Sequence, residues 1–277
     1  MKRIRRTAKL MFIYAAVAVV LIWALFPVFW IASSSIRPQY EIVATPLRYL
    51  PQTVTFRSYK TAFADPAFLR ALRNTVAVAS LTTILGLAAG ALAAYAFARF
   101  DFKLKRPLFL SIFLIRMIPA FTLAIPLFVA MRTFGLIDTI AALVLTHTTL
   151  VLPVSILIMR TFFENLPAAY EEAAMMDGAT RLQVLTRIVL PLSTPALMVA
   201  GVVSMISSWN DYLFGLLFTL TKARTIMVAI ADVEGAFYVD YPLIVARGMI
   251  ALIPPVVAAL AFQRYLVRGL TGGVMTQ

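Results

Sequence analysis

Long runs of apolar residues are the feature that most restricts how this chain can fold. Residues 10–32 include no charged side chain over 23 consecutive positions. At about 1.5 Å per residue, such a helix can cross a hydrocarbon layer about 30 Å thick. Inside a bilayer the backbone must satisfy its own hydrogen bonds, and continuous apolar runs favour helices over the alternating strands of a barrel. We therefore expect an all-α integral membrane protein.

Six apolar runs of this kind follow one another along the chain. The composition agrees, because 62% hydrophobic and 13% charged residues are too apolar for a soluble domain of 277 residues. Residues 212–220 are too few to span, so we expect a re-entrant or interfacial piece, with a continuation of the fifth span as the alternative. A cleaved signal peptide is the alternative for the first run, which exceeds an ordinary signal core. The expected spans are residues 10–32, 75–98, 108–131, 140–159, 188–208 and 243–263.

Basic residues set the expected orientation in the membrane. With the N-terminus in the cytoplasm, 14 of the 25 Lys and Arg residues fall on cytoplasmic segments and nine on outside segments. The short basic segments next to spans carry this bias, and an even number of spans puts both termini on the same side. We expect a cytoplasmic N-terminus with the first span (1–33), an extracytoplasmic loop (34–73), a core of five spans (74–268) and a cytoplasmic tail (269–277).

Glycines and prolines indicate where the spans pack and bend. Gly86 and Gly90 have the spacing that lets two helices approach closely. Pro119, Pro126 and the pair 254–255 interrupt the hydrogen-bond ladders of the third and sixth spans. These prolines are either points where a span bends during a conformational change or static kinks that help packing.

The sequence lacks the residues that several classes of site need. It has no cysteine, and its single histidine has no neighbouring carboxylate cluster, so we expect no metal site. The net charge of +13 fits loops that touch membrane lipid better than a nucleic-acid footprint. An integral membrane enzyme would need a catalytic cluster at an interface. A stand-alone secondary transporter would be expected to have paired intramembrane carboxylates, but no expected span holds Asp or Glu in its middle.

A polar island interrupts the apolar runs and is expected to form a helix–turn–helix elbow (164–185). Residues 168–176 are good helix formers, and Gly178 can take the left-handed conformation that closes a helix. Thr180 and Gln183 have the spacing of a capping box, so a second helix should begin at once. The predicted orientation places this elbow on the cytoplasmic face.

The first helix of the elbow carries an acidic face. We expect Glu171 and Glu172 to point outward, while Ala173 and Ala174 let another surface approach closely. A plain amphipathic helix that caps the bundle is the alternative. Anionic lipid attracts basic helices rather than acidic ones, so a protein partner explains the two glutamates better.

The segment EAAMMDGATRLQVLTRIVLP (172–191) resembles the EAA loop of the membrane subunits of bacterial ABC importers that depend on a binding protein. The resemblance rests on Glu172-Ala173-Ala174, on Gly178, and on an Ile-x-Leu-Pro ending at the right distance. The stretches RNTVAVAS, AAYAFARFDF and SWNDYLFGLL are similar to the carbohydrate-type permeases of the maltose-transporter branch. The resemblance covers nearly the whole chain.

The resemblance implies a type I ABC importer permease with six transmembrane helices and a cytoplasmic coupling helix, in the bacterial cytoplasmic membrane. It implies import of a sugar, half of the translocation path, and four kinds of partner: a second homologous permease, two ATP-binding subunits, an extracytoplasmic substrate-binding protein and membrane lipid. The sequence has no phosphate-binding loop, since no lysine follows a glycine, so ATP and Mg belong to the partner ATPase and this chain is not an enzyme. The residues implied in ATPase coupling are Glu171, Glu172, Ala173, Ala174, Asp177, Gly178, Ile188, Leu190 and Pro191.

Four residues near the fourth and fifth spans and one in the third are candidates for polar contacts inside the membrane. Arg116 lies about 13 Å into the third span, where it faces a cavity or pairs with a carboxylate or backbone carbonyl. Trp209, Asn210 and Asp211 could contact a sugar, or could form an interfacial anchor with polar capping. We expect His147 to be a satisfied core histidine rather than a ligand or proton relay.

The outer segment 221–241 is long and mixed in character. In similar permeases the corresponding loop reaches toward the substrate-binding protein. The candidates for this contact are Val233, Glu234, Gly235, Ala236 and Phe237.

Overall fold

The computed structural model describes residues 2–232 and 239–271, and most of these residues are helical. Four helices are long and apolar enough to cross a membrane, and two bent helix pairs raise the number to six if each pair is one span. This agrees with the six spans expected from the sequence. The four long helices are α1 (Lys2–Ser35), α4 (Pro66–Arg99), α7 (Ile140–Glu164) and α14 (Tyr241–Thr271).

The third expected span, 108–131, is broken rather than continuous. It consists of α5 (Lys105–Met117) and α6 (Ala120–Thr133), which are bent by 99° to each other. Pro119 explains the break, because a proline disfavours the helical conformation of the residue before it, and Ile118 is extended with φ −71° and ψ 127°. Pro126 lies inside α6 and Pro254–Pro255 inside α14, and both helices continue through them.

The fifth expected span, 188–208, is also broken, with a bend of 82° at Ser193. Pro191 and Pro195 each remove a donor from the ladder on either side of this point. A π-helical turn directly precedes Pro191, a common way to fit a proline into a helix without a clash. The segments are α9 (Arg181–Val184), η1 (Leu185–Val189), α10 (Leu190–Leu192) and α11 (Thr194–Trp209).

The chain divides into two compact units. The first contains residues 1–69 and 230–252, with α1, α2 (Gln39–Ile42) and α3 (Arg57–Ala64). Two buried charged side chains hold the loop between α1 and α3 in place through hydrogen bonds. The Arg37 guanidinium donates to the carbonyl of Arg48 at 2.6 Å, and the Glu41 carboxylate accepts the backbone N–H of Thr53 at 2.8 Å.

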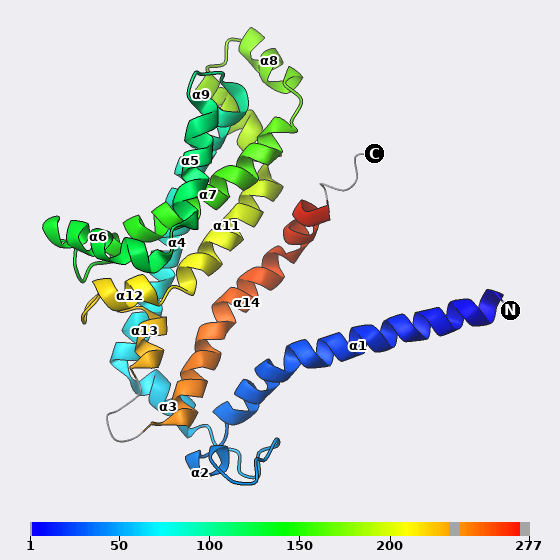
Figure 1. Cartoon of the computed structure of the whole chain (residues 1–277), viewed down its shortest axis with the longest axis vertical. Helices are drawn as coiled ribbons and strands as arrows, with labels where there is room; N and C mark the ends of the chain where they lie inside the picture. The colour runs from blue at the N-terminus through cyan, green and yellow to red at the C-terminus, as the bar shows by residue number, and fades with distance from the viewer. Residues whose placement is uncertain (1, 233–238, 272–277) are drawn as a thin grey trace. The chain divides into compact units, whose positions relative to one another are not determined.

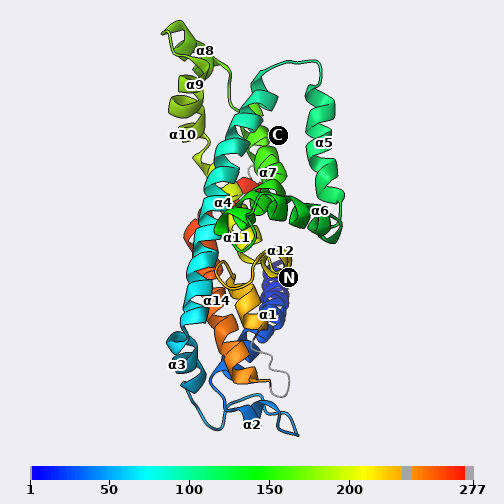
Figure 2. The same cartoon turned by 90° about the vertical axis from the view of Figure 1, so that its left-hand side faces the viewer.

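The second unit contains residues 70–229 and 253–277 and holds the helices that concern function. Within it, α4, α7 and α11 lie side by side, with α8 (Ala169–Met176) and α9 at one end and α12 (Leu213–Phe218) near the other (Figures 1 and 2). Residues 212–220 therefore form a short helix separate from α11. It buries Phe214 and Phe218 against α6 and α7, as part of an apolar core cluster. A last short helix, α13 (Ile226–Ala231), follows.

The glycines of α4 pack as their spacing predicts. A Cβ atom on Gly86 would lie 2.9 Å from Val151, and one on Gly90 would lie 2.7 Å from Met159. Real Cβ atoms essentially never approach other atoms so closely, so a larger residue at either position would require these side chains of α7 to shift.

One carboxylate fixes the segment that directly follows α12. Asp138, between α6 and α7, accepts the backbone N–H groups of four consecutive residues, Leu220–Ala223, at 2.9–3.2 Å. Burial raises the pKa of Asp138, but these four N–H groups outweigh burial and lower the pKa to about 2. Asp138 adopts a positive φ of 60°, a conformation that Asp and Asn tolerate better than most residues.

We expect Asp138→Asn to lower the free energy of unfolding by about 2 kcal/mol, because the amide keeps the backbone conformation but loses the charged acceptor. The folded-state pKa is depressed, so this contribution is complete above the ordinary Asp pKa of about 4 and is lost as the pH falls toward 2. Thermal unfolding in detergent at pH 7 and at pH 3 measures both effects. The exposed Asp101→Asn is the control, and equal stability of the two variants at pH 7 would contradict the assignment.

Candidate functional site

A cavity of about 410 Å³, lined by apolar residues and six polar ones, lies in the second unit beside the break between α5 and α6 and the middle of α7. It is bounded by the end of α5, the break before α6, the centre of α7 and the end of α11. Charged side chains within a membrane span are energetically expensive, and those that occur usually face an internal cavity such as this one. Its polar lining residues are Arg116, His147, Thr149, Ser207, Ser208 and Asp211.

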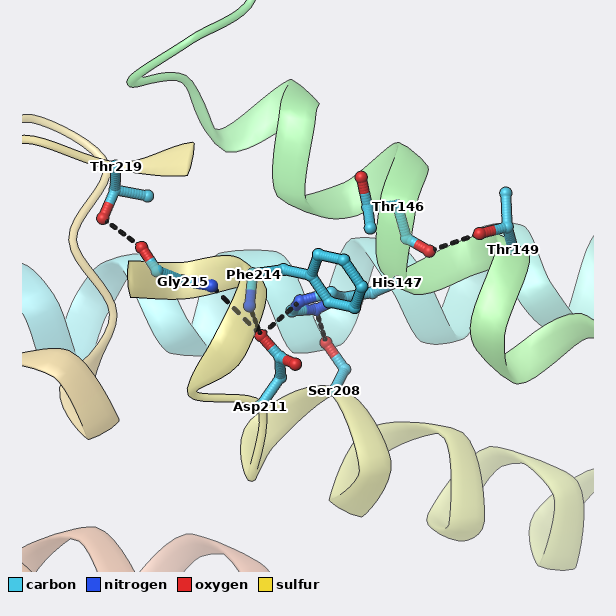
Figure 3. A network of polar contacts seen from close by, with 8 residues as sticks. All are labelled: Thr146, His147, Thr149, Ser208, Asp211, Phe214, Gly215 and Thr219. Carbon is cyan, nitrogen blue, oxygen red and sulfur yellow. Dashed lines mark hydrogen bonds and ion pairs between the residues drawn. The ribbon is translucent and has the colours of Figure 1, made fainter. Parts of the chain in front are cut away.

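Three side chains that line the cavity contact one another. Figure 3 shows these contacts. His147 Nδ1 lies 2.8 Å from Ser208 Oγ, and His147 Nε2 lies 3.2 Å from Asp211 Oδ2. The second contact has the distance of an ion pair but not the geometry of a hydrogen bond. Asp211 Oδ2 also accepts the backbone N–H groups of Phe214 and Gly215, both at 3.1 Å, and so fixes the first turn of α12.

This network joins two residues that the sequence treated separately. The expectation that His147 is a buried histidine with partners agrees with its position, because it is buried and contacts Ser208 and Asp211. Asp211, a candidate for contact with a sugar, lines the cavity, and its role on a substrate path stays a prediction. The pairing itself has no sequence signal, since the two residues lie on different helices and are not spaced as any local motif.

Arg116 combines the two alternatives considered for it. Its guanidinium Nη1 donates to the backbone carbonyl of Leu150 in α7 at 2.6 Å, and the residue also lines the cavity. Arg116 is in the last turn of α5 rather than in the middle of a continuous span, because the chain breaks after Met117.

Trp209 and Asn210 do not line the cavity with Asp211. Trp209 is only 1% exposed and belongs to the core, so its ring is not available to stack on a solute from this cavity. Asn210 is exposed and ends α11 as its C-cap. Residues Val233, Glu234, Gly235, Ala236 and Phe237 lie outside the described residues, so their contact with a binding protein stays a prediction.

The elbow has the local structure that its sequence predicts. Helix α8 ends at Met176, Gly178 has a positive φ of 86°, and α9 follows at Arg181. Thr180 and Gln183 form both hydrogen bonds of the capping box, at 2.8 and 3.3 Å. These features depend on neighbouring residues alone, and for that reason the sequence was sufficient to predict them.

The expected outward orientation of Glu171 is wrong. Glu171 is 3% exposed, and its carboxylate accepts hydrogen bonds from Tyr95 Oη at 2.8 Å and Arg99 Nε at 2.6 Å, both on α4. Arg99 also donates to the carbonyl of Leu166 at 2.9 Å. The helical spacing explains the orientation, because residues three and four positions after Glu171 share its face, and these residues, Ala174 and Met175, pack on the same core cluster.

Glu172 lies on the opposite, exposed face of α8. Ala173, Asp177 and Gly178 are exposed beside it, and Met176 is 88% exposed. Ile188 and Leu190 are half-buried on η1 and α10, and Pro191 is exposed there, so these three residues belong to the base of the elbow.

Comparison with known proteins shows what the chain is similar to. Residues 86–272 match the family of the binding-protein-dependent transport system inner membrane component. The chain is 40% identical over 256 residues to the trehalose transport system permease protein SugB of Mycobacterium tuberculosis, covering 91% of this chain and 93% of that protein. It is 35% identical over 261 residues to the sulfoquinovosyl glycerol transport system permease protein SmoH of Agrobacterium fabrum, covering 94% and 92%. Among solved structures it is similar to a bacterial ABC transporter involved in the import of the acidic polysaccharide alginate, with a TM-score of 0.75, 26% identity, and coverage of 94% of this chain and 98% of that one.

The two adjacent glutamates of α8 should differ sharply in their effect on stability. Glu171→Gln leaves Arg99 without its buried charge partner, so we expect a loss of about 3 kcal/mol, whereas Glu172→Gln should change the free energy of unfolding by less than about 0.5 kcal/mol. Thermal unfolding of the purified chain in detergent measures both variants. Equal effects would show that Glu171 is not held between Tyr95 and Arg99.

Proposed function

Because this chain belongs to the family of inner membrane components of binding-protein-dependent transport systems, we propose that it is one permease subunit of an ATP-driven importer of a carbohydrate. The observation that carries the choice of carbohydrate is the similarity over nearly its full length to a trehalose permease. The chain is a multi-pass inner-membrane protein. With both termini in the cytoplasm, as the basic loops indicate, the elbow faces the cytoplasm as well.

The cavity between α5, α7 and α11 is the proposed part of the solute path. Carbohydrate hydroxyls donate to carboxylates and accept from guanidinium groups, and Asp211 and Arg116 bring one of each to the cavity. Asp211 Oδ2 is engaged by His147 and by two backbone N–H groups, whereas Oδ1 has no partner among the described residues. This oxygen is therefore the acceptor that we assign to a sugar hydroxyl.

The exposed face of α8 is the proposed site of contact with a separate ATP-hydrolysing subunit. Glu172 and Met176 stand out from this face, and Ala173 leaves room for a close approach. The opposite face is fastened to α4 through Glu171, so a push on α8 is passed to α4 as well as to α11. In this assembly ATP and Mg are bound by the two ATPase copies, a second homologous permease supplies the other half of the path, and an extracytoplasmic binding protein delivers the sugar.

We expect Asp211→Asn to lower the rate of sugar uptake about tenfold, because the amide removes the charged acceptor from the cavity. Uptake is measured in proteoliposomes that contain the complete transporter and its binding protein, with a panel of disaccharides that includes trehalose. The neighbouring Asn210→Ala is the matched control, since Asn210 is exposed and outside the cavity. Unchanged uptake by Asp211→Asn for every sugar that the transporter accepts would remove Asp211 from the path.

Reversing the charge at Glu172 tests the coupling surface. Glu172→Arg should abolish the stimulation of ATP hydrolysis by loaded binding protein, because it places a cation where the proposed contact uses an anion. Arg132→Glu, an equal and opposite charge change at an exposed residue of α6, should leave stimulation intact. Co-purification of the ATPase and ATPase assays measure the two steps, and full stimulation of Glu172→Arg would contradict docking at α8.

A further inference from the structure

A second pocket of the same unit, of about 510 Å³, combines basic side chains with aromatic ones. It lies where α5 begins, next to the end of α4 and the last part of α7. Four basic residues line it against a single acidic one, so its local charge is strongly positive. The lining residues are Asp101, Phe102, Lys103, Lys105, Arg106, Phe109, Leu110 and Arg160.

Packed aromatic rings form one wall of this pocket, so the charged side chains lie against an ordered surface. The ring of Phe109 lies 5.4 Å from that of Phe97 and 4.9 Å from that of Phe113 between centroids. The Arg160 guanidinium lies 4.0 Å from the centre of the Phe109 ring, and its Nε donates to Glu164 at 2.8 Å. Arg160 is therefore held in a fixed position beside the pocket.

The other three cations, Lys103, Lys105 and Arg106, form no ion pair within the described part of the chain. No carboxylate of the described residues lies within ion-pair distance of Lys103, Lys105 or Arg106, although Asp101 lines the same pocket. Three like charges around one pocket repel one another, and an anion placed between them relieves this repulsion. A phosphate group suits the pocket, because its oxygens accept several charge-assisted hydrogen bonds at once.

The exposed face of α5 that continues from the pocket indicates a lipid as the source of that phosphate. Arg106, Leu110 and Leu114 are spaced four residues apart, so they follow one another along the same face of α5. Leu110 and Leu114 are both exposed, and Leu110 also lines the pocket. We propose that this pocket binds the phosphate of an anionic phospholipid, with an acyl chain lying along Leu110 and Leu114. Basic pockets at the ends of membrane spans are suited to such headgroups.

Native mass spectrometry of the complete transporter tests this proposal. The transporter is taken from nanodiscs of phosphatidylcholine with or without phosphatidylglycerol, and the retained lipids are counted. The triple variant Lys103→Gln, Lys105→Gln, Arg106→Gln should retain phosphatidylglycerol at least tenfold more weakly than the wild type. The control removes the same charge from exposed residues elsewhere, Lys60→Gln, Arg70→Gln and Arg73→Gln, and should retain it normally.

Three results would overturn the proposal. Equal retention by the wild type and the pocket variant, or an equal loss in both triple variants, would show that lipid binding is not local to this pocket. Displacement of phosphatidylglycerol by millimolar inorganic phosphate would assign the pocket to a soluble anion instead. If the triple variant does not fold, Arg106→Gln compared with Arg73→Gln gives the same test. The outcome does not depend on which solute is transported, so it can fail while the proposed function stands.

Discussion

Backbone groups inside a hydrocarbon layer have no water to bond with, and this constraint explains where the polar side chains of the protein lie. The end of each helix leaves backbone groups without a partner inside that helix. Near the break after α5, Arg116 donates to a carbonyl of α7, and after α11 the Asp211 carboxylate accepts two N–H groups of α12. Two of the polar side chains that line the cavity therefore also bond backbone groups of neighbouring segments.

Helix α11 connects the two functional regions of the second unit directly. It follows the elbow through η1 and α10, and the chain reaches Asp211 two residues after it ends. Helix α4 is joined to the elbow by a different means, the buried contact of Glu171 with Tyr95 and Arg99. Between them, α7 packs on both helices, with Ser155 of α7 3.1 Å from Ser204 of α11. A displacement of α8 thus has one covalent and one noncovalent route toward the cavity.

Sequence reasoning succeeded where structure depends on near neighbours and failed where it depends on distant ones. The apolar spans, the capping box at Thr180 and the left-handed Gly178 are local features, and all were predicted. The burial of Glu171 was not, because two adjacent glutamates look equivalent until the packing of α8 on α4 decides which one turns inward. The contact of His147 with Asp211 and the bend angle at Pro119 likewise depend on how separate helices are placed, which no spacing in the sequence encodes.

The short helix α12 is held by carboxylates at both of its ends. Asp211 binds its first turn, and Asp138 binds the four residues that come just after it. Only the first of these carboxylates lines the cavity. A solute that draws Asp211 away from these two N–H groups must shift the start of α12, and by thermodynamic linkage the shift alters the affinity for that solute by the same free energy.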